Sequence, residues 1–265
     1  MKIIEDALKE DIGIEDITTN SIVPKDKKLK AILFAKEDGV IAGLDIAEEV
    51  LKTLDKNLKF IKEIDDGAHI KKGKILAKIE GNARAILTGE RVALNFLQKM
   101  SGIATLTDQF VKLSGKIKVK DTRKTTPGLR VLEKYAVKMG GGTNHRMRLD
   151  DAVLIKDNHI MFAGSVAEAV RRVKTTGKKI EVEVENIRQL REVIDAGADS
   201  ILLDNMSVSE IKKAVKIAKN IETEISGGVN LKNIKKYTKT GATYISIGAL
   251  THSPKGLDIS LEVVK

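Results

Sequence analysis

The chain has 265 residues, with five phenylalanines, three tyrosines, no tryptophan and no cysteine, and 47 Lys and Arg against 37 Asp and Glu give a formal net charge of +10. A hydrophobic content of 42% excludes a disordered chain, and the absence of cysteine excludes disulfides, thiol catalysis and thiolate metal sites. No run reaches the roughly 20 apolar residues that a membrane helix needs, and the first residues lack the apolar core of a signal peptide. We therefore expect a soluble, cytoplasmic protein whose basic charge serves nucleic acid, an acidic membrane surface or an anionic small molecule.

The first hundred residues predict a mixed region of helices and strands. Apolar residues repeat with a helical period over residues 3–8, and a polar turn follows over residues 16–20. Short alternating runs predict strands over residues 29–35, 39–43 and 74–81. Residues 45–54 predict a helix capped by Asp45. The stretch 86–113 has helical spacing, and Gly102 could bend or split that helix.

From residue 117 onward the sequence predicts six strand–helix units in series. Strands are expected over residues 117–121, 152–156, 180–184, 201–204, 224–226 and 244–247. Helices are expected over residues 128–139, 165–175, 187–196, 207–219 and 230–239. Serial units of this kind have right-handed crossovers and form a parallel sheet, which could be open and doubly wound or rolled into a barrel.

The run Glu181-Val182-Glu183-Val184-Glu185 favours the barrel. Alternate side chains of a strand point to opposite faces, so both valines face the packed helices and the three glutamates share the other face. Carboxylates without partners are costly beneath a second helix layer, whereas the upper interior of a barrel can be polar. An edge strand with one solvated face is the alternative.

Candidate functional residues follow the strands, because active sites in parallel α/β folds lie at the carboxyl ends of strands. After the first strand, Thr122, Arg123 and Lys124 lie in a hydroxyl-rich turn that opens a helix and suits an anion. The glycine run 140–142 then presents His145 and Arg146 from a loop. Ordinary loops with solvated charges are the alternative for both segments.

The next apolar strand ends in Lys156, followed by His159. A lysine at this place could be an anion ligand, a nucleophilic amine or an ion-paired residue at the barrel lip. His159 could equally cap a helix. Glu185 and Asp204 lie on successive strand ends and could hold Mg²⁺ through oxygen ligands, or pair with Lys156.

The last two strands end in short segments suited to phosphate. In barrels, the late loops together with a helix N-terminus often bind phosphate. The residues at these positions are Ser226, Gly227 and Gly228 after one strand, and Gly248, Ala249 and Leu250 after the other. Taken with the cations and acids, they predict a ligand with several anionic groups, such as a phosphorylated sugar together with an acid.

These motifs resemble the quinolinate phosphoribosyltransferase family. The resemblance rests on Asp121–Arg130 (DTRKTTPGLR), Gly140–Arg146 (GGGTNHR) and Asp151–His159 (DAVLIKDNH). It continues in order through the rest of the chain, at residues 89–91, 95–96, 183–186, 202–206, 224–228 and 247–250. The first two of these motifs together are highly specific.

The resemblance implies an N-terminal α/β sandwich domain over residues 1–105, to which a C-terminal tail of residues 253–265 returns. An incomplete, open parallel α/β barrel over residues 106–252 is the implied catalytic domain. The implied reaction transfers phosphoribose from phosphoribosyl pyrophosphate to quinolinate with decarboxylation, and yields nicotinate mononucleotide, CO₂ and pyrophosphate for NAD biosynthesis. Mg²⁺ is the implied cofactor. The implied assembly is a homodimer with a shared active site, and a hexamer of dimers is also compatible.

The resemblance also implies roles for individual residues. Arg123, His145, Arg146 and Lys156 would surround the two quinolinate carboxylates, and Arg91 would reach into the neighbouring subunit's site. The implied catalytic residues are Lys124, Lys156, Glu185 and Asp204. Within that set, Lys124 would contact the pyrophosphoryl groups, while Glu185 and Asp204 would hold the metal and ribose hydroxyls. The remaining implied substrate-binding residues are Thr122, His159, Ser226, Gly227, Gly228, Gly248, Ala249 and Leu250.

Three other functions are alternatives to this one. A paralogous pyrophosphorylase associated with molybdate transport would share the fold and the phosphate loops, but not necessarily the dicarboxylate pocket. A polyanion-binding protein would use the lysine-rich surface, yet single-strand binders stack bases on aromatic side chains, which are few here. A purely structural barrel would leave the polar strand ends unexplained. We therefore expect small-molecule substrates and neither a nucleic-acid nor a membrane partner.

Overall fold

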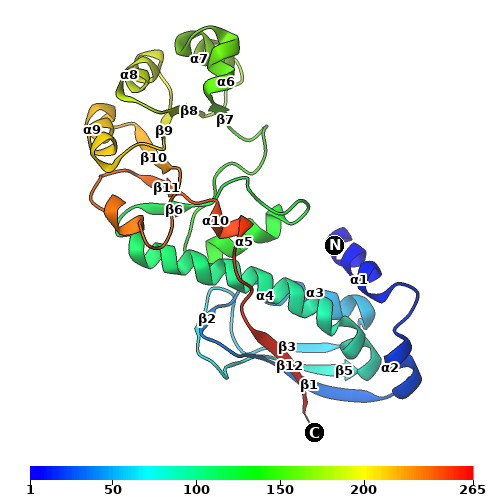
Figure 1. The fold of residues 1–265 in the computed structure, drawn as a ribbon. Helices are drawn as coiled ribbons and strands as arrows, with labels where there is room; N and C mark the ends of the chain where they lie inside the picture. Colours follow the sequence, from blue (N-terminus) through cyan, green and yellow to red (C-terminus); the bar gives the residue numbers. More distant parts are fainter. Residues whose placement is uncertain (265) are drawn as a thin grey trace. The chain divides into compact units, whose positions relative to one another are not determined.

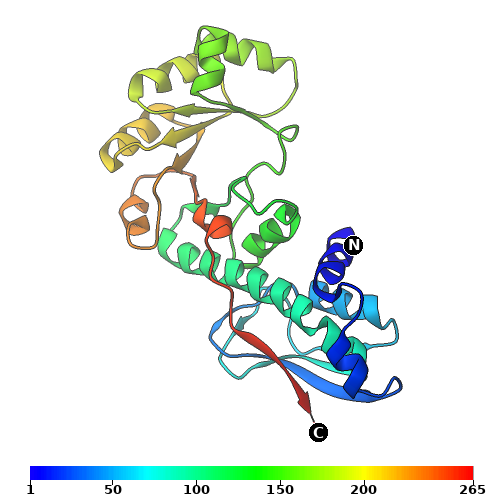
Figure 2. The same cartoon turned by 45° about the vertical axis from the view of Figure 1, so that its right-hand side comes forward.

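Two large sheets, one antiparallel and one parallel, organise the chain in the computed structural model (Figures 1 and 2). The structure describes residues 1–264, and Lys265, the last residue of the predicted C-terminal tail, lies outside the described residues. The chain divides into a first unit of residues 1–106, 127–140 and 253–265, and a second unit of residues 107–126 and 141–252. Within the described part of the chain, no helix combines the length and hydrophobicity needed to cross a membrane.

The first unit is built on an antiparallel sheet with the strand order β12-β1-β5-β3. Its strands are β1 (Lys28–Ala35), β3 (Lys59–Lys62), β5 (Ile75–Asn82) and β12 (Ile259–Val264), and a separate short ladder pairs β2 (Gly39–Val40) with β4 (His69–Ile70). Its helices are α1 (Lys2–Ile12), α2 (Ile17–Ile22), α3 (Leu44–Leu54), the larger part of α4 (Ala83–Ser114) and α5 (Arg130–Met139). In both ribbon views α3 and α4 lie on the same side of this sheet, which gives a sandwich of helices and strands (Figures 1 and 2).

The segment after His252 belongs to the first unit, where it supplies an edge strand. β12 pairs antiparallel with β1, from Ala35 opposite Ile259 to Lys30 opposite Val264. The side-chain amide of Gln98 on α4 also donates to the carbonyl oxygen of Ile259 at 2.7 Å. The tail is thus held both by a strand ladder and by a helix of the same unit.

Gly102 lies inside an unbroken α4, although the sequence allowed a bend there. A Cβ atom at this position would lie 2.1 Å from the carbonyl oxygen of Lys255 and 3.0 Å from the Cα atom of Gly256. The glycine therefore permits a close passage of backbone over the helix, which any side chain would obstruct.

The second unit is a six-stranded parallel sheet with the order β6-β11-β10-β9-β8-β7. Its strands are β6 (Lys118–Lys120), β7 (Val153–Ile155), β8 (Ile180–Val184), β9 (Ser200–Asp204), β10 (Glu222–Ser226) and β11 (Tyr244–Ser246). Its helices are α6 (Asp157–Ala163), α7 (Val166–Lys174), α8 (Ile187–Ala196), α9 (Val208–Ala218), the 3₁₀-helix η1 (Ile234–Tyr237) and α10 (Ala249–His252). Among the described strands β6 and β7 are the two edges, so the predicted incomplete, open α/β barrel is confirmed.

The core of the second unit lies between this sheet and its helices. The apolar faces of α8 and α9 bury Leu190, Val193 and Ile211, and the strands bury Val182, Leu203 and Ile225 against them. Each such side chain contributes about 1.5–3 kcal/mol when it is removed from water. The helix layer thereby fixes one face of the sheet and leaves the other face to polar side chains.

Several local predictions are wrong. Residues 17–20 belong to a helix, α2, and Asp16 caps it, because its carboxylate accepts the Thr19 N–H at 2.9 Å. Helix α3 is capped by Asp66, which accepts the N–H groups of Gly43 and Leu44, and Asp45 lies within the helix.

The predicted helix over residues 230–239 is reduced to the single turn η1. The side chain of Asn230 accepts the N–H groups of Lys232 and Asn233, which competes with helical hydrogen bonding at this start. Helix α6 is not among the predicted elements.

The helix predicted over residues 128–139 forms as α5, and it lies in the first compact unit.

Replacement of Gly102 by alanine tests the close passage over α4. We expect Gly102→Ala to lower the free energy of unfolding by about 2 kcal/mol or more, because backbone atoms must move. Gly89→Ala in the same helix is the matched control, since its Cβ would meet mainly flexible side-chain atoms of Leu51 and Leu54. That variant should stay within about 1 kcal/mol of the wild type, helped by the better helix propensity of alanine. Urea unfolding measures both, and equal losses would contradict this account.

Candidate active site

The predicted strand-end residues of the second unit lie along one edge of its parallel sheet. Because the strands run parallel and adjacent, their carboxyl ends lie on the same side. The residues that end or follow β6 to β11 in the chain are, in turn, Thr122, Arg123 and Lys124; Lys156; Glu185; Asp204; Ser226, Gly227 and Gly228; and Gly248, Ala249 and Leu250. Arg91 lies in the first unit, where it is exposed on α4.

The loop that carries His145 is hydrogen-bonded to the edge strand β6. The Thr143 N–H donates to the Val119 carbonyl oxygen at 2.8 Å, and the Asp121 N–H donates to the Thr143 carbonyl oxygen at 3.1 Å. The fully buried Asp121 carboxylate then accepts the His145 N–H at 2.8 Å. The loop thus extends the sheet beyond β6 and brings His145 to the polar face.

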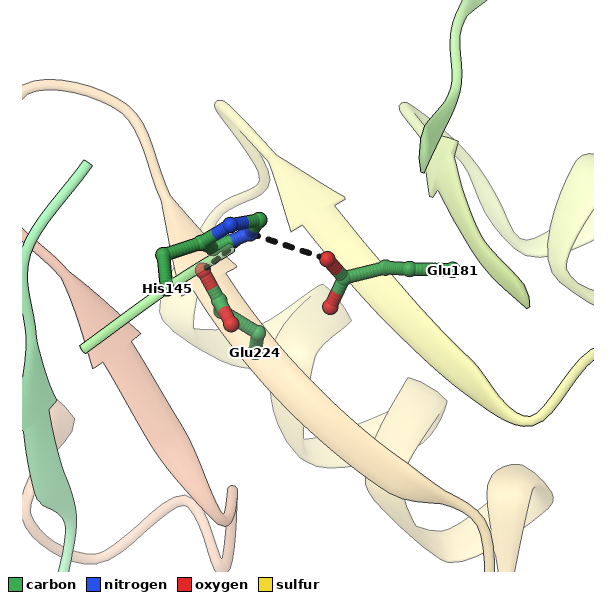
Figure 3. A group of neighbouring side chains, drawn as sticks. All are labelled: His145, Glu181 and Glu224. Atoms are coloured by element: carbon green, nitrogen blue, oxygen red, sulfur yellow. Dashed lines mark hydrogen bonds and ion pairs between the residues drawn. The ribbon is translucent and has the colours of Figure 1, made fainter. Parts of the chain in front are cut away.

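His145 lies between two buried glutamates from different strands (Figure 3). Its Nε2 atom lies 3.0 Å from a carboxylate oxygen of Glu181 on β8 and 3.7 Å from one of Glu224 on β10. Its Nδ1 atom accepts the backbone N–H of Arg146 at 2.8 Å. Since Nδ1 is an acceptor, these contacts assign the ring proton to Nε2, which donates to Glu181.

The pKa values of the two carboxylates beside His145 are shifted in opposite directions. Burial raises the pKa of Glu224, and the negative charge of Glu181 raises it further. Burial also acts to raise the pKa of Glu181, but the hydrogen bond with His145 and the positive charges nearby outweigh it and leave that pKa lowered. Lys120 on β6 forms an ion pair with Glu224, and its ammonium lies 3.8 Å from the ring centre of Tyr244. Positive charge therefore compensates the buried acids.

Arg123 and Arg146 form a repulsive pair of cations. Burial lowers the pKa of the Arg146 guanidinium, and the positive charge of Arg123 lowers it further. The Nε atoms of both side chains are buried, and neither has a hydrogen-bond partner among the described residues. One Arg146 Nη atom donates to the Ala152 carbonyl oxygen at 2.9 Å. An anion placed between the guanidinium groups would relieve the repulsion and use the free donors.

Lys156 pairs with Glu183, not with either of the predicted acids. Its ammonium lies 2.6 Å from the Glu183 carboxylate. Glu185 lies two residues after Glu183 and is exposed. Its backbone N–H donates to the Gln189 side chain at the start of α8. The Nδ1 atom of His159 accepts the Lys156 N–H at 2.9 Å and so caps α6. Of the two roles considered for His159, helix capping and a functional role, the structure shows capping.

The segments predicted to bind phosphate lie against other residues near the strand ends. A Cβ atom on Gly248 would lie 2.9 Å from the Lys124 side chain, so the absence of a side chain leaves room for that lysine. Gly227 and Gly228 both have positive φ angles, and a Cβ on Gly227 would collide with the Asn205 side chain. Glycine at these places lets backbone N–H groups approach a ligand.

Two sets of residues have side chains of the types that bind metal ions. His145, Glu181 and Glu224 lie close enough to hold one ion. However, both nitrogens of His145 are engaged in hydrogen bonds, and Lys120 already pairs with Glu224, so the trio offers no free nitrogen lone pair. Glu185 and Asp204 supply carboxylate oxygens from neighbouring strand ends, the donor type that Mg²⁺ prefers. The donor chemistry fits the predicted pair.

Comparison with known proteins agrees with the motif pattern. A family model described as quinolinate phosphoribosyl transferase, C-terminal domain, matches residues 103–262, and the N-terminal domain model of the same family matches residues 16–101. The chain belongs to the quinolinate phosphoribosyltransferase family.

Individual members of the family match over nearly the whole chain. A probable nicotinate-nucleotide pyrophosphorylase (carboxylating) of Bacillus subtilis is 46% identical and covers 99% of this chain and 92% of its own. Its counterpart in Methanocaldococcus jannaschii is 45% identical, with coverage of 100% and 97%. The crystal structure of NadC from Streptococcus pyogenes matches with a TM-score of 0.95 at 42% identity, over 100% of this chain and 96% of that one. The family resemblance and the fold class predicted from the sequence are confirmed.

Four residues near the quinolinate phosphoribosyltransferase motifs were not predicted as site residues: Lys120, Glu181, Glu183 and Glu224. The alternation of the glutamates in β8 did place Glu181 and Glu183 on the polar face. Glu224 lies two residues before Ser226, on the same face of β10, so alternation could have found it as well. A cavity of about 500 Å³ in the second unit is lined by Lys120, Glu181, His145 and Arg146, among others.

The repulsion between the two arginines yields a stability prediction. Replacement of Arg123 by methionine removes one cation and keeps much of the side-chain volume. We expect Arg123→Met to leave the free energy of unfolding unchanged or to raise it by up to about 1 kcal/mol without ligand, as functional residues often cost stability. Stabilisation by added quinolinate should be lost.

Urea unfolding with and without quinolinate makes this measurement. Arg148→Met is the control, because Arg148 is exposed and pairs with Asp150 at 2.9 Å. The control should keep the quinolinate effect. A loss of more than about 2 kcal/mol in Arg123→Met without ligand would show that Arg123 supports the fold, against this interpretation.

Proposed function

We propose that this protein transfers phosphoribose from phosphoribosyl pyrophosphate to quinolinate and decarboxylates the product, giving nicotinate mononucleotide, CO₂ and pyrophosphate in NAD biosynthesis. Family membership over the whole chain supports the reaction class, that of a pentosyltransferase. The observation that carries the substrate assignment is the half-buried pair Arg123 and Arg146, whose buried, unpartnered Nε donors and mutual repulsion suit an anion between them. Quinolinate provides two adjacent carboxylates for such a site.

Recognition of quinolinate combines charge and orientation. Arg123 and Arg146 would bind one side of the dicarboxylate, beside His145, whose two ring nitrogens are already engaged by Glu181 and the Arg146 N–H. Lys156 would approach the other side once it exchanges its contact with Glu183. Arginine forms planar, paired hydrogen bonds with a carboxylate, which fixes the ring in one orientation. Oriented in this way, the pyridine nitrogen would face the ribose carbon that it attacks.

The chemistry requires no covalent nucleophile. The bond between ribose C1 and the pyrophosphate oxygen breaks as the pyridine nitrogen bonds to C1, and the developing positive charge on the sugar passes to the ring nitrogen. Lys124 would stabilise the departing pyrophosphate, beside the phosphate loops at Ser226–Gly228 and Gly248–Leu250. The carboxylate at C2 then leaves as CO₂, its electron pair stays on C2 beside the positive nitrogen, and C2 takes up a proton.

Glu185 and Asp204 would hold Mg²⁺ and would also contact the ribose hydroxyls. When bound, Mg²⁺ neutralises charge on the pyrophosphate. The two carboxylates themselves would also lie close to the cationic sugar carbon and favour it electrostatically. His159, as the cap of α6, would fix the backbone at Lys156.

The active unit would be a homodimer in which Arg91 of one subunit completes the site of the other, and a hexamer of dimers is compatible with it. The exposed position of Arg91 on α4 agrees with a role toward a partner. A cytoplasmic location and the absence of a nucleic-acid partner remain predictions from composition.

Activity measurements test the proposed reaction. Incubation with quinolinate, phosphoribosyl pyrophosphate and Mg²⁺ should produce nicotinate mononucleotide and CO₂ in equal amounts, whereas nicotinate in place of quinolinate should give no comparable turnover. Arg146→Ala and Lys156→Ala should each lower kcat/KM for quinolinate by about 100-fold, the cost of about 2.7 kcal/mol for a lost charged contact. Unchanged quinolinate turnover in both variants would refute the assignment of the site.

A mixing experiment tests the shared site. Arg91→Ala and Lys156→Ala should each be nearly inactive alone. If Arg91 acts across the dimer, a mixed dimer carries both substitutions in one site and neither in the other. Unfolding and refolding an equal mixture should therefore restore about a quarter of wild-type activity. No recovery, with the mixed dimers verified by mass spectrometry, would place Arg91 outside the partner's site.

A further inference from the structure

The polar face of the parallel sheet contains a chain of hydrogen bonds that leads from Glu181 through His145 to the backbone of Arg146. The Glu181 carboxylate accepts the Nε2 proton of His145 at 3.0 Å, and His145 Nδ1 accepts the Arg146 N–H at 2.8 Å. The hydroxyl of Ser200 donates to the second oxygen of Glu181 at 3.5 Å. Each end of the imidazole is thus held by the protein, and the ring has one orientation.

Glu224 is close to the same ring but is held elsewhere. Lys120 binds one of its carboxylate oxygens, and Lys120 in turn lies over the Tyr244 ring. The other oxygen stays 3.7 Å from His145 Nε2 and has no hydrogen-bond partner among residues 1–264. Glu224 thus stays beyond hydrogen-bond distance of the ring, and Glu181 is the acceptor for the histidine (Figure 3).

We propose that Glu181 is a positioning residue that acts through His145: it holds the imidazole in the Nε2–H form, so that Nδ1 can accept the Arg146 N–H and place the Arg146 guanidinium for the substrate. Without an acceptor at Nε2, the ring can turn or change tautomer. A proton on Nδ1 would then face the proton of the Arg146 N–H, and the two donors would repel each other. The loop that carries Arg146 would lose its fixed position.

The importance of Arg146 for quinolinate rests on the function proposed above, whereas the state of the His145 ring does not. Nitrogen-15 NMR of the histidines therefore gives a readout that is independent of activity. The chain has four histidines, and Glu181 can be changed without altering any of them. A His145→Gln variant assigns the signals of His145.

The experiment compares Glu181→Leu, Glu181→Gln and the wild type in the full-length protein. In the wild type, His145 should give one protonated nitrogen, Nε2, and one unprotonated nitrogen, Nδ1. Glu181→Leu removes the acceptor, so the signals should change to a mixture of tautomers. The KM for quinolinate should rise about tenfold or more while the KM for phosphoribosyl pyrophosphate stays the same. Glu181→Gln keeps an acceptor oxygen and should remain within about threefold of the wild type.

Glu222→Leu is the matched control. Glu222 lies on β10, and its carboxylate pairs with Lys179 at 2.6 Å and accepts the Tyr244 hydroxyl at 3.2 Å. This variant should leave the His145 signals and the quinolinate KM unchanged. Thermal unfolding of all variants separates a local effect from a loss of fold.

Two results would overturn the proposal. One is a His145 spectrum in Glu181→Leu that equals that of the wild type, for example because Glu224 replaces the lost acceptor. The other is a rise of both KM values to the same extent in Glu181→Leu and Glu222→Leu, which would indicate a general structural effect. If the wild-type protein does not turn over quinolinate, the proposed function fails, and the NMR comparison still decides the role of Glu181.

Discussion

The constraint on which the second unit depends is the compensation of buried charge on the polar face of its parallel sheet. Strand alternation turns one set of side chains toward the helices and the other set toward the polar face, where Glu181 and Glu224 are buried and an unpaired charge is costly. Glu181 and Glu224 lie together on this face. Lys120 forms an ion pair with Glu224, and His145 contacts Glu181. The same interaction helps to fix the loop after β6, because His145 on that loop contacts the Glu181 carboxylate.

This compensation is incomplete at the two arginines. Arg123 and Arg146 bring like charges together and leave buried donors without partners among the described residues. A folded protein tolerates such an arrangement when stability elsewhere offsets it, and the apolar layer of α8 and α9 supplies that stability. An incoming dianion gains from the same arrangement, because its charge replaces a repulsion with two attractions.

The first unit shows a different use of close contact. The tail that ends in β12 crosses α4 at Gly102, where a missing side chain admits backbone at 2.1 Å from the Cβ position. In the sequence, this glycine resembles a helix breaker, yet α4 is unbroken through it. Local helix propensity disfavours glycine at this position, whereas tertiary packing requires it, and packing decides the outcome.

The sequence by itself determined the family, through motifs such as DTRKT and GGGTNHR, and most elements of the second unit, through the periods of its apolar residues. Alternation also placed Glu181 and Glu183 on one face, since that property is local to a strand. Only the tertiary structure decided which charges meet. Lys156 pairs with Glu183, and His145 with Glu181, because strand order brings together residues that lie 27 and 36 positions apart in the chain. Pairing across a sheet depends on that order and on the loop paths, neither of which a local pattern specifies.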